Sequence, residues 1–175
     1  MTMIQPRKTA NTRDASSPVE ELRQNFRGAM RRLPSGVGII ATNDGQRWYG
    51  MTATAISSVS MDPPSLMVGI NRTASIHDPL QESGVFSVSI LRRDHAEIGQ
   101  AFATLPSAER FTVGEWELGE LGCPRLVGAQ AVIMCRIGTV VPYGTHSLVI
   151  GEVIETLVDQ AVDPLVFVDG TFRAD

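Results

Sequence analysis

The first periodic stretch of the chain has the pattern of an amphipathic helix. Ser17-Pro18-Val19-Glu20 combines an N-cap hydroxyl, a proline at the first helical position and a glutamate three residues after the cap. Apolar residues then recur at helical spacing, namely Val19, Leu22, Phe26, Ala29 and Met30. The pattern predicts a capped helix that ends near Leu33-Pro34. Residues 1–16 are polar and have no apolar period, so they predict a disordered leader before a folded domain of residues 17–175.

Most of the following chain consists of short apolar runs separated by turn residues. Gly36–Thr42 and Arg47–Ala53 flank the turn signal Asn43-Asp44-Gly45, which predicts a hairpin. Further strands are predicted at Ser65–Ile70, Val85–Leu91, Gln130–Val141, His146–Val158 and Leu165–Val168. About seven strands linked mainly by turns favour a closed or Greek-key β-barrel over a parallel sheet.

Two more helices are predicted between these strands. A short one ends at Gly84, and another begins at the capping box Asp94–Glu97, with Ile98, Ala101 and Phe102 as its apolar stripe. Residues 104–128 show no clear period and predict an irregular segment.

Composition narrows the possible functions. With 175 residues, 43% of them hydrophobic, the chain can close one sizeable core, and a net charge of −4 argues against nucleic acid or an anionic membrane surface as partners. The only lysine is Lys8, so a P-loop or a Schiff base cannot form in the predicted domain. Two cysteines are too few for a disulfide framework, and no segment has the length and hydrophobicity of a signal peptide or a membrane span. We therefore expect a cytoplasmic protein.

Two sequence features suggest dinucleotide binding and metal binding, but the surrounding residues argue against both functions. Gly36–Ala41 fits the G-x-G-x-x-A pattern of dinucleotide-binding folds, but it follows a helix and leads into β-branched residues, the reverse of the required order. His77, His95 and His146 lie far apart without a second ligand at a recognisable spacing, so no metal is expected.

Other segments have two interpretations on chemistry alone. Gly50–Leu66 places six Ser and Thr hydroxyls in a connection between two strands, which can hold a polar ring or a phosphate, although such hydroxyls more often satisfy turn backbone. Arg72 precedes a short helix, where it is either an anion ligand or a solvated charge. His146 most often satisfies loop backbone, and Phe172-Arg173 is typical of a frayed tail.

Beyond these single segments, the sequence resembles the short flavin reductase family, the reductase components of two-component flavin-dependent monooxygenases. The resemblance runs in order through Phe26–Val37, Gly50–Pro64, Asn71-Arg72, Ser83–Val88, Arg110-Phe111, Gly122–Leu126, Gly151–Val153 and Pro164-Leu165. It covers about 150 residues, which makes chance agreement implausible although each motif alone is weak.

The resemblance implies a mainly β fold, a Greek-key split β-barrel with a few short peripheral helices, which forms a homodimer. It implies FMN or FAD as loosely bound flavin, NADH or NADPH as hydride donor, and a monooxygenase as the partner that receives reduced flavin. It also implies site residues. The flavin-binding residues would be Met51, Thr52, Ala53, Thr54, Ser57, Ser58, Asn71, Arg72, Ser75, Phe172 and Arg173, with His146 as the catalytic-site residue near the nicotinamide.

One departure weakens the role of His146. The family's Gly-Asp-His is Gly144-Thr145-His146 here, so a charge that would orient the imidazole is missing. Two alternatives stay open: a flavin-binding module without reductase activity, and a split-barrel oxidase with its own organic substrate.

Overall fold

The computed structural model describes residues 17–173, and the predicted leader, residues 1–16, lies outside the described residues. The chain divides into two compact units, one ending at Leu33 and one beginning at Pro34. The first contains helix α1 (Pro18–Met30), whose N-cap Ser17 accepts a hydrogen bond from the backbone N–H of Glu20 at 3.3 Å. The predicted capped helix is therefore confirmed. None of the helices within residues 17–173 is both long and apolar enough to cross a membrane.

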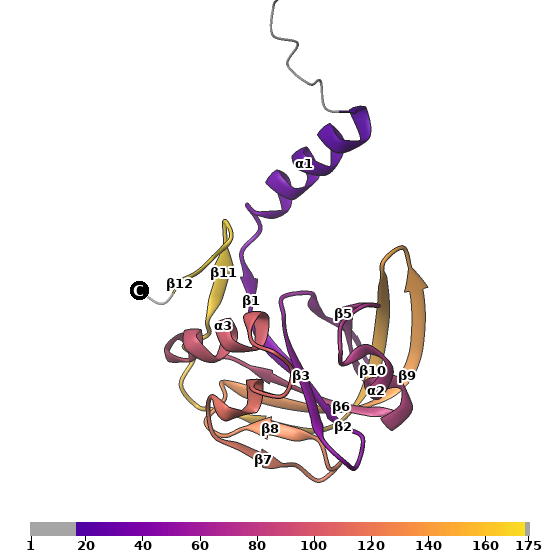
Figure 1. Ribbon diagram of the computed structural model, residues 1–175. Coiled ribbons are helices and arrows are strands. Elements are labelled where there is room, and N and C mark those ends of the chain that lie inside the picture. Colours follow the sequence, from indigo (N-terminus) through magenta and orange to yellow (C-terminus); the bar gives the residue numbers. More distant parts are fainter. Residues whose placement is uncertain (1–16, 174–175) are drawn as a thin grey trace, which may run out of the picture. The chain divides into compact units, whose positions relative to one another are not determined.

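The second unit is built on one antiparallel sheet of seven strands (Figure 1). The strands are β2 (Gly38–Asn43), β3 (Trp48–Ala53), β4 (Ile56–Met61), β5 (Pro64–Asn71), β6 (Val85–Ile90), β9 (Ala131–Tyr143) and β10 (His146–Val158). Their order is β3-β2-β6-β9-β10-β5-β4. The two edge strands, β3 and β4, are joined by only two residues, so the sheet must curl until its edges approach each other. No backbone pairing joins β3 to β4 in this sheet, so the barrel is split there. This agrees with the split β-barrel that the family resemblance implies.

Two small sheets complete the fold. Strand β1 (Ser35–Gly36) pairs with β11 (Val166–Val168), which pairs with β12 (Thr171–Arg173). Strands β7 (Trp116–Leu118) and β8 (Pro124–Leu126) form a second antiparallel pair. The interpretation of Phe172-Arg173 as a frayed tail is therefore wrong, because backbone pairing with β11 holds these residues in a strand. Residues 104–128 were predicted to be irregular, yet they contain β7 and β8. The prediction missed these strands because three residues are too few to show a period.

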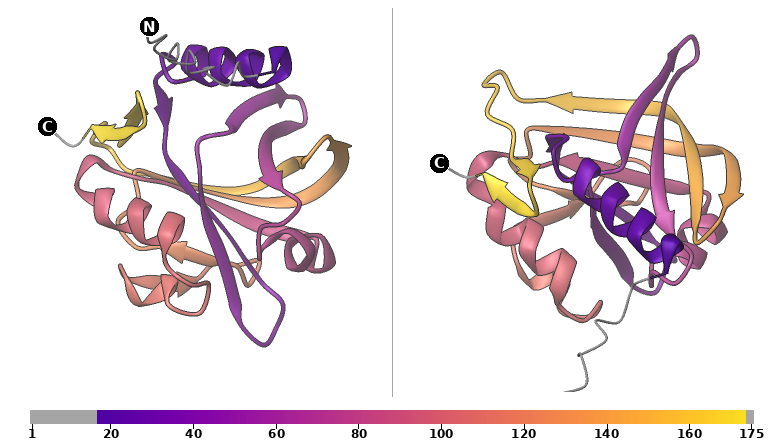
Figure 2. Two further views of the ribbon diagram at one scale, coloured as in Figure 1. Left: turned by 45° about the horizontal axis from the view of Figure 1, so that its top comes forward. Right: turned by 90° about the horizontal axis from the view of Figure 1, so that it is seen from above.

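Strand β4 is the largest departure from the predicted elements. The hydroxyl-rich segment was expected to be a connection, yet Ile56–Met61 pairs with β5 (Ser57↔Met67, Ser58↔Leu66), with an irregularity between Ser58 and Ser60. In the right-hand view of Figure 2 the hairpin of β4 and β5 stands out from the rest of the sheet. An edge strand needs few apolar residues, because much of its surface faces solvent, and a polar sequence therefore conceals it.

The helices cover the barrel at two places. Helix α2 (His77–Ser83) ends at Gly84, whose φ of 70° is the left-handed conformation expected at a helix end. Helix α3 (Ala96–Thr104) follows a 3₁₀ turn, η1 (Arg93–His95), and a second 3₁₀ turn, η2, spans Arg110–Thr112. The predicted capping box at Asp94–Glu97 is wrong, because the chain enters α3 through the 3₁₀ turn and the N-cap of α3 is His95, which makes no side-chain cap bond. In that turn the Arg92 backbone N–H donates to His95 Nδ1 at 3.4 Å, and the His95 backbone N–H donates to the Arg92 carbonyl oxygen at 3.0 Å.

The apolar residues form two main clusters on opposite faces of the sheet. The barrel interior is filled by buried side chains that include Ile40, Val68, Ile70, Phe86 and Val88. The second cluster lies under α3, and its buried residues are Val37, Ile39, Leu91, Ile98, Phe102, Leu126 and Leu165. The predicted α3 stripe is thus confirmed: Ile98, Ala101 and Phe102 are all buried.

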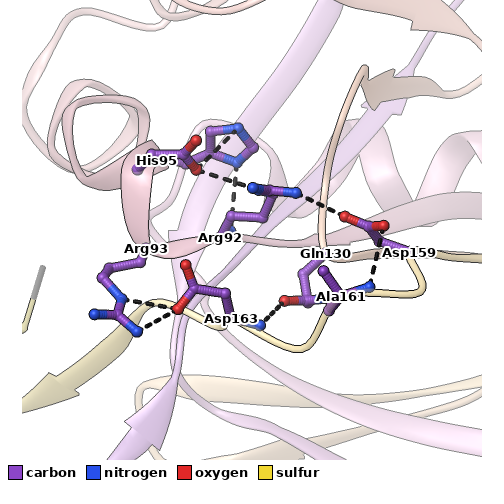
Figure 3. Close-up of polar contacts among 8 residues, drawn as sticks. Arg92, Arg93, His95, Gln130, Asp159, Ala161 and Asp163 are labelled. Carbon is purple, nitrogen blue, oxygen red and sulfur yellow. Dashed lines mark hydrogen bonds and ion pairs between the residues drawn. The ribbon is translucent and has the colours of Figure 1, made fainter.

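A polar network fastens the connection between β10 and β11 to the start of α3 (Figure 3). Arg92 Nη1 donates to Asp159 Oδ2 at 2.7 Å, and Arg93 Nε donates to Asp163 Oδ1 at 2.8 Å. The backbone N–H of Asp163 also donates, at 2.6 Å, to Oε1 of Gln130, the residue before β9. These bonds hold the β10–β11 connection against the barrel, so that the hairpin of β11 and β12 packs beside α3.

Candidate active site

The end of β5 and the turn between β9 and β10 bring two of the predicted segments together. In the β5–β10 ladder His146 lies opposite Asn71, and the Arg72 backbone N–H donates to the carbonyl oxygen of Thr145 at 3.0 Å. More than seventy positions in the sequence separate Asn71 and Arg72 from Thr145 and His146. The structure therefore places Asn71, Arg72 and His146 at one end of neighbouring strands.

A cavity of about 650 Å³ opens at this end of the barrel. Its lining residues are Asn71, Arg72, Thr73, His77, Asp78, Gly144 and Thr145. Within residues 17–173 no carboxylate forms an ion pair with the exposed guanidinium of Arg72. A cation without a protein counter-ion at a cavity of this size suits a phosphate-bearing ligand.

Five of the seven lining residues were not predicted as site residues, and two of them, His77 and Asp78, carry titratable side chains. His77 Nδ1 lies 2.6 Å from Asp78 Oδ1, and His77 Nε2 lies 3.0 Å from Ser147 Oγ, so the ring links α2 to β10 beside the cavity. Ser147 is buried, which excludes it as an accessible nucleophile. The sequence carries no signal for this link, because seventy residues separate His77 from Ser147 and only the fold brings them together.

The turn after β5 uses some of the predicted polar groups for its own structure. Asn71 Oδ1 accepts hydrogen bonds from both the backbone N–H and the hydroxyl of Thr73, each at 3.0 Å. Among residues 17–173 the Asn71 amide nitrogen has no hydrogen-bond partner, so it can donate to a ligand. Ser75 is exposed and does not line the cavity.

A second group of predicted residues gathers around Gly99 on α3. The Thr52 hydroxyl donates to the Gly99 carbonyl oxygen at 2.7 Å, and a Cβ on Gly99 would lie 3.2 Å from the Phe172 ring. Phe172 also packs edge-on against Phe167, with ring centroids 5.4 Å apart. Thr52 and Phe172 are thus partly engaged in packing α3 against the barrel, while Arg173, the next residue along β12, is exposed.

The remaining predicted residues follow the split between β3 and β4. Met51 is half-buried and Ala53 is buried at the end of β3, whereas Thr54, Ser57 and Ser58 are exposed. The Gly69 N–H donates to the Ala55 carbonyl oxygen at 2.9 Å, which places Thr54 beside the part of β5 that leads to Asn71 and Arg72. Ser57 and Ser58 pair with Met67 and Leu66 in the antiparallel register, so of the three exposed hydroxyls that of Thr54 lies nearest to the end of β5 that leads to the cavity.

The arrangement favours binding and orientation over proton transfer. His146 is exposed, and its Nδ1 lies 2.9 Å from the hydroxyl of Thr145, a partner that carries no charge. It does not line the cavity. A flat polar ring and a phosphate chain fit the residues present: hydroxyls at the split, and at the cavity a guanidinium that no carboxylate of the described residues pairs with.

Comparison with known proteins identifies this arrangement with a family. The family model described as "Flavin reductase like domain" matches residues 30–174. The chain is 41% identical over 159 residues to the reductase component of the FADH2-dependent resorcinol hydroxylase of a Rhizobium species, covering 89% of this chain and 88% of the relative. It is 36% identical to an FMN reductase (NADH) of Stutzerimonas stutzeri, covering 89% of each chain.

A solved structure gives the same assignment. The NADH:FAD oxidoreductase of Streptomyces globisporus, in complex with NAD and FAD fragments, superposes with a TM-score of 0.82 at 30% identity, covering 87% of this chain and 92% of that one. Sequence and fold therefore agree over nearly the whole second unit.

Proposed function

The chain belongs to the flavin reductase-like family, and from that membership we propose how its described residues bind the reactants. The protein is an NAD(P)H-dependent flavin reductase that supplies reduced flavin to a monooxygenase. The observation that carries the proposed binding mode is Arg72 at the cavity, which has no ion-pair partner among residues 17–173, with the exposed hydroxyl of Thr54 beside the part of β5 that leads to it.

The flavin, FMN or FAD, accepts a hydride from the dihydronicotinamide of NADH or NADPH. This reaction needs two stacked rings and no proton donor from the protein. The protein contributes geometry, because the β3–β4 split offers backbone groups and short hydroxyls instead of bulky charged side chains. Release of reduced flavin to the partner favours a shallow, exposed site of modest affinity.

We assign the predicted residues to two ends of the flavin. The ring end lies along Met51, Thr52, Ala53, Thr54, Ser57 and Ser58. The phosphate end is held by Arg72, with the amide nitrogen of Asn71 beside it, and the exposed Ser75 hydroxyl lies next to this end but outside the cavity lining. His146 seats the nicotinamide, and the pair Phe172-Arg173 borders the ring end from β12.

The active unit that we propose is a homodimer. Val59 and Met61 on β4 and Ile154 on β10 are 52%, 83% and 46% exposed, and all three lie toward the same end of the β4–β5–β10 region. Large apolar side chains grouped on a surface are typical of protein interfaces. Sedimentation velocity should show two chains, whereas a fully active monomer at the working concentration would contradict the proposal.

The partner receives reduced flavin by diffusion or transient contact, and we propose that this takes place in the cytoplasm. The cysteines Cys123 and Cys135 are both free thiols, as expected for a reducing compartment. No direct contact with the oxygenase is required, because reduced flavin that leaves an open site can reach another protein by diffusion.

Oxidation of NADH and of NADPH, each with FMN and with FAD and without any oxygenase, tests the proposed function. Turnover with at least one pair supports it. A flavin-binding module would bind flavin without oxidising either dinucleotide, and an oxidase would consume oxygen only with an organic substrate. Measuring flavin binding in parallel separates these outcomes from a protein that has lost its fold.

A further inference from the structure

A second cavity, of about 420 Å³, lies at the other end of β3 from the split. Its lining residues are Gln46, Arg47, Trp48, Ser107, Ala108 and Phe111. Trp48 begins β3, and Met51, the first flavin-binding residue assigned on this strand, lies three residues further along, so at about 3.3 Å per residue the two are roughly 10 Å apart. The six lining residues include none of the assigned flavin-binding residues, so the cavity adjoins the ring end without sharing a residue with it.

One wall of this cavity is aromatic, formed by Trp48 and Phe111, and its rings are held in place by packing. The rings of Trp48 and Phe111 meet edge to face, with centroids 5.4 Å apart and an interplanar angle of 75°. Phe111 also packs edge-on against Phe102 and Trp116, each at 5.0 Å. A ligand that enters would meet an aromatic surface that needs little reorganisation.

The loop that closes one side is tied to the barrel by Arg110. Its Nε donates to the carbonyl oxygen of Leu105 at 3.0 Å, and its Nη1 donates to that of Gly50 at 2.6 Å. Burial lowers the pKa of Arg110, although the group stays charged because an arginine pKa lies so far above neutrality. These bonds hold Ser107 and Ala108 opposite β3.

A single cation is presented at the rim of the cavity. The Arg47 guanidinium lies 4.5 Å from the Tyr49 ring centroid, and its Nε donates to the Tyr49 hydroxyl. That hydroxyl in turn donates to Asp44 Oδ2 at 2.9 Å, while Asp44 Oδ1 accepts from the backbone N–H groups of Gln46 and Arg47. These backbone hydrogen bonds, together with the nearby positive charge of Arg47, lower the pKa of the Asp44 carboxyl. Within residues 17–173 the terminal nitrogens of Arg47 donate to no residue, so they can still bind an anionic group.

We propose that this cavity binds a small planar aromatic anion, with the ring against Trp48 and Phe111 and the anionic group on Arg47. Two sources share this chemistry: an aromatic carboxylate, and the adenosine phosphate part of a nucleotide. The cavity volume is within the range of 300–1,000 Å³ typical of small-molecule sites. Neither Arg47 nor the aromatic wall is among the flavin-binding residues proposed above. A test of this cavity therefore does not depend on whether the proposed flavin site is correct.

Isothermal titration calorimetry with phenylacetate and with AMP tests the proposal, in the presence of saturating FMN so that the flavin site is filled. At least one probe should bind saturably. For phenylacetate, both cyclohexylacetate, which lacks the aromatic ring, and phenylacetamide, which lacks the charge, should bind at least about fivefold more weakly. Binding of phenylacetate alone assigns the site to an aromatic carboxylate, and binding of AMP alone assigns it to a nucleotide.

Arg47→Gln should lower the affinity for the probe that binds by about fivefold or more. The rate of NADH-dependent flavin reduction without the probe should stay unchanged. Arg136→Gln, which alters an exposed arginine on β9, should leave probe binding unchanged and is the matched control. The proposal is overturned if neither probe binds up to about 10 mM, if FMN displaces the probe, or if the two variants behave alike. A thermal melt of each variant confirms that the fold persists.

Discussion

Replacement of Arg72 by alanine examines the phosphate end of the proposed flavin site. The Arg72 guanidinium has no ion-pair partner among residues 17–173, so its removal leaves no charged group without its partner and should leave the fold intact. The backbone N–H of residue 72 would still donate to Thr145, because that bond does not involve the side chain. The expected effect is therefore confined to the ligand.

The size of the effect follows from the exposure of Arg72. A hydrogen bond to a charged group contributes about 1.5–3 kcal/mol, and solvent around an exposed side chain lowers this to about 1–2 kcal/mol. Arg72→Ala should then weaken FMN binding roughly 5- to 30-fold. Riboflavin, which has the same ring system but no phosphate, should bind to the variant and to the unmodified protein with equal affinity.

Titration of flavin fluorescence measures both affinities. Arg136→Ala is the matched control, because Arg136 is also exposed but lies on β9 away from the cavity lining, and it should leave FMN affinity unchanged. Equal losses for FMN and riboflavin would mean that Arg72 acts on the ring or on the fold, and the assignment to the phosphate would be wrong.

The other predictions concern catalysis, reactivity and stability. His146→Ala should raise the KM for NADH, and anaerobic reduction at saturating NADH should slow less than about tenfold; a loss of about 10²–10⁴ would make His146 part of the chemical step. Burial raises the pKa of Cys123 to about 11 and of Cys135 to about 12, so both thiols stay protonated at pH 8 and a thiol reagent should label them only after denaturation. Gly50→Ala should lower the free energy of unfolding by about 1–3 kcal/mol, because its Cβ would lie 2.6 Å from a Phe102 ring atom; an unchanged denaturant midpoint would refute this. Deletion of residues 1–16 should leave flavin reduction unchanged, and a large loss with intact fold would place the leader in the site.

The sequence by itself determined most elements of this protein, because their signals are local. The cap at Ser17, the Asn43-Asp44-Gly45 turn and the glycine after α2 are each read from a few neighbouring residues. The long strands β9 and β10 were also visible, because both are rich in Val and Ile and are bounded by turn residues. The resemblance to flavin reductases identified the family before any geometry was available, since it depends on the order of many weak motifs.

Tertiary structure alone decided which residues meet. The pairing of His146 with Asn71, the bond from Arg72 to Thr145 and the link between His77 and Ser147 depend on the register of β5 and β10. Register results from packing between distant strands, and no local pattern specifies it. The polar strand β4 also escaped prediction, because an edge strand is stabilised by pairing with β5 and not by burial of its own side chains.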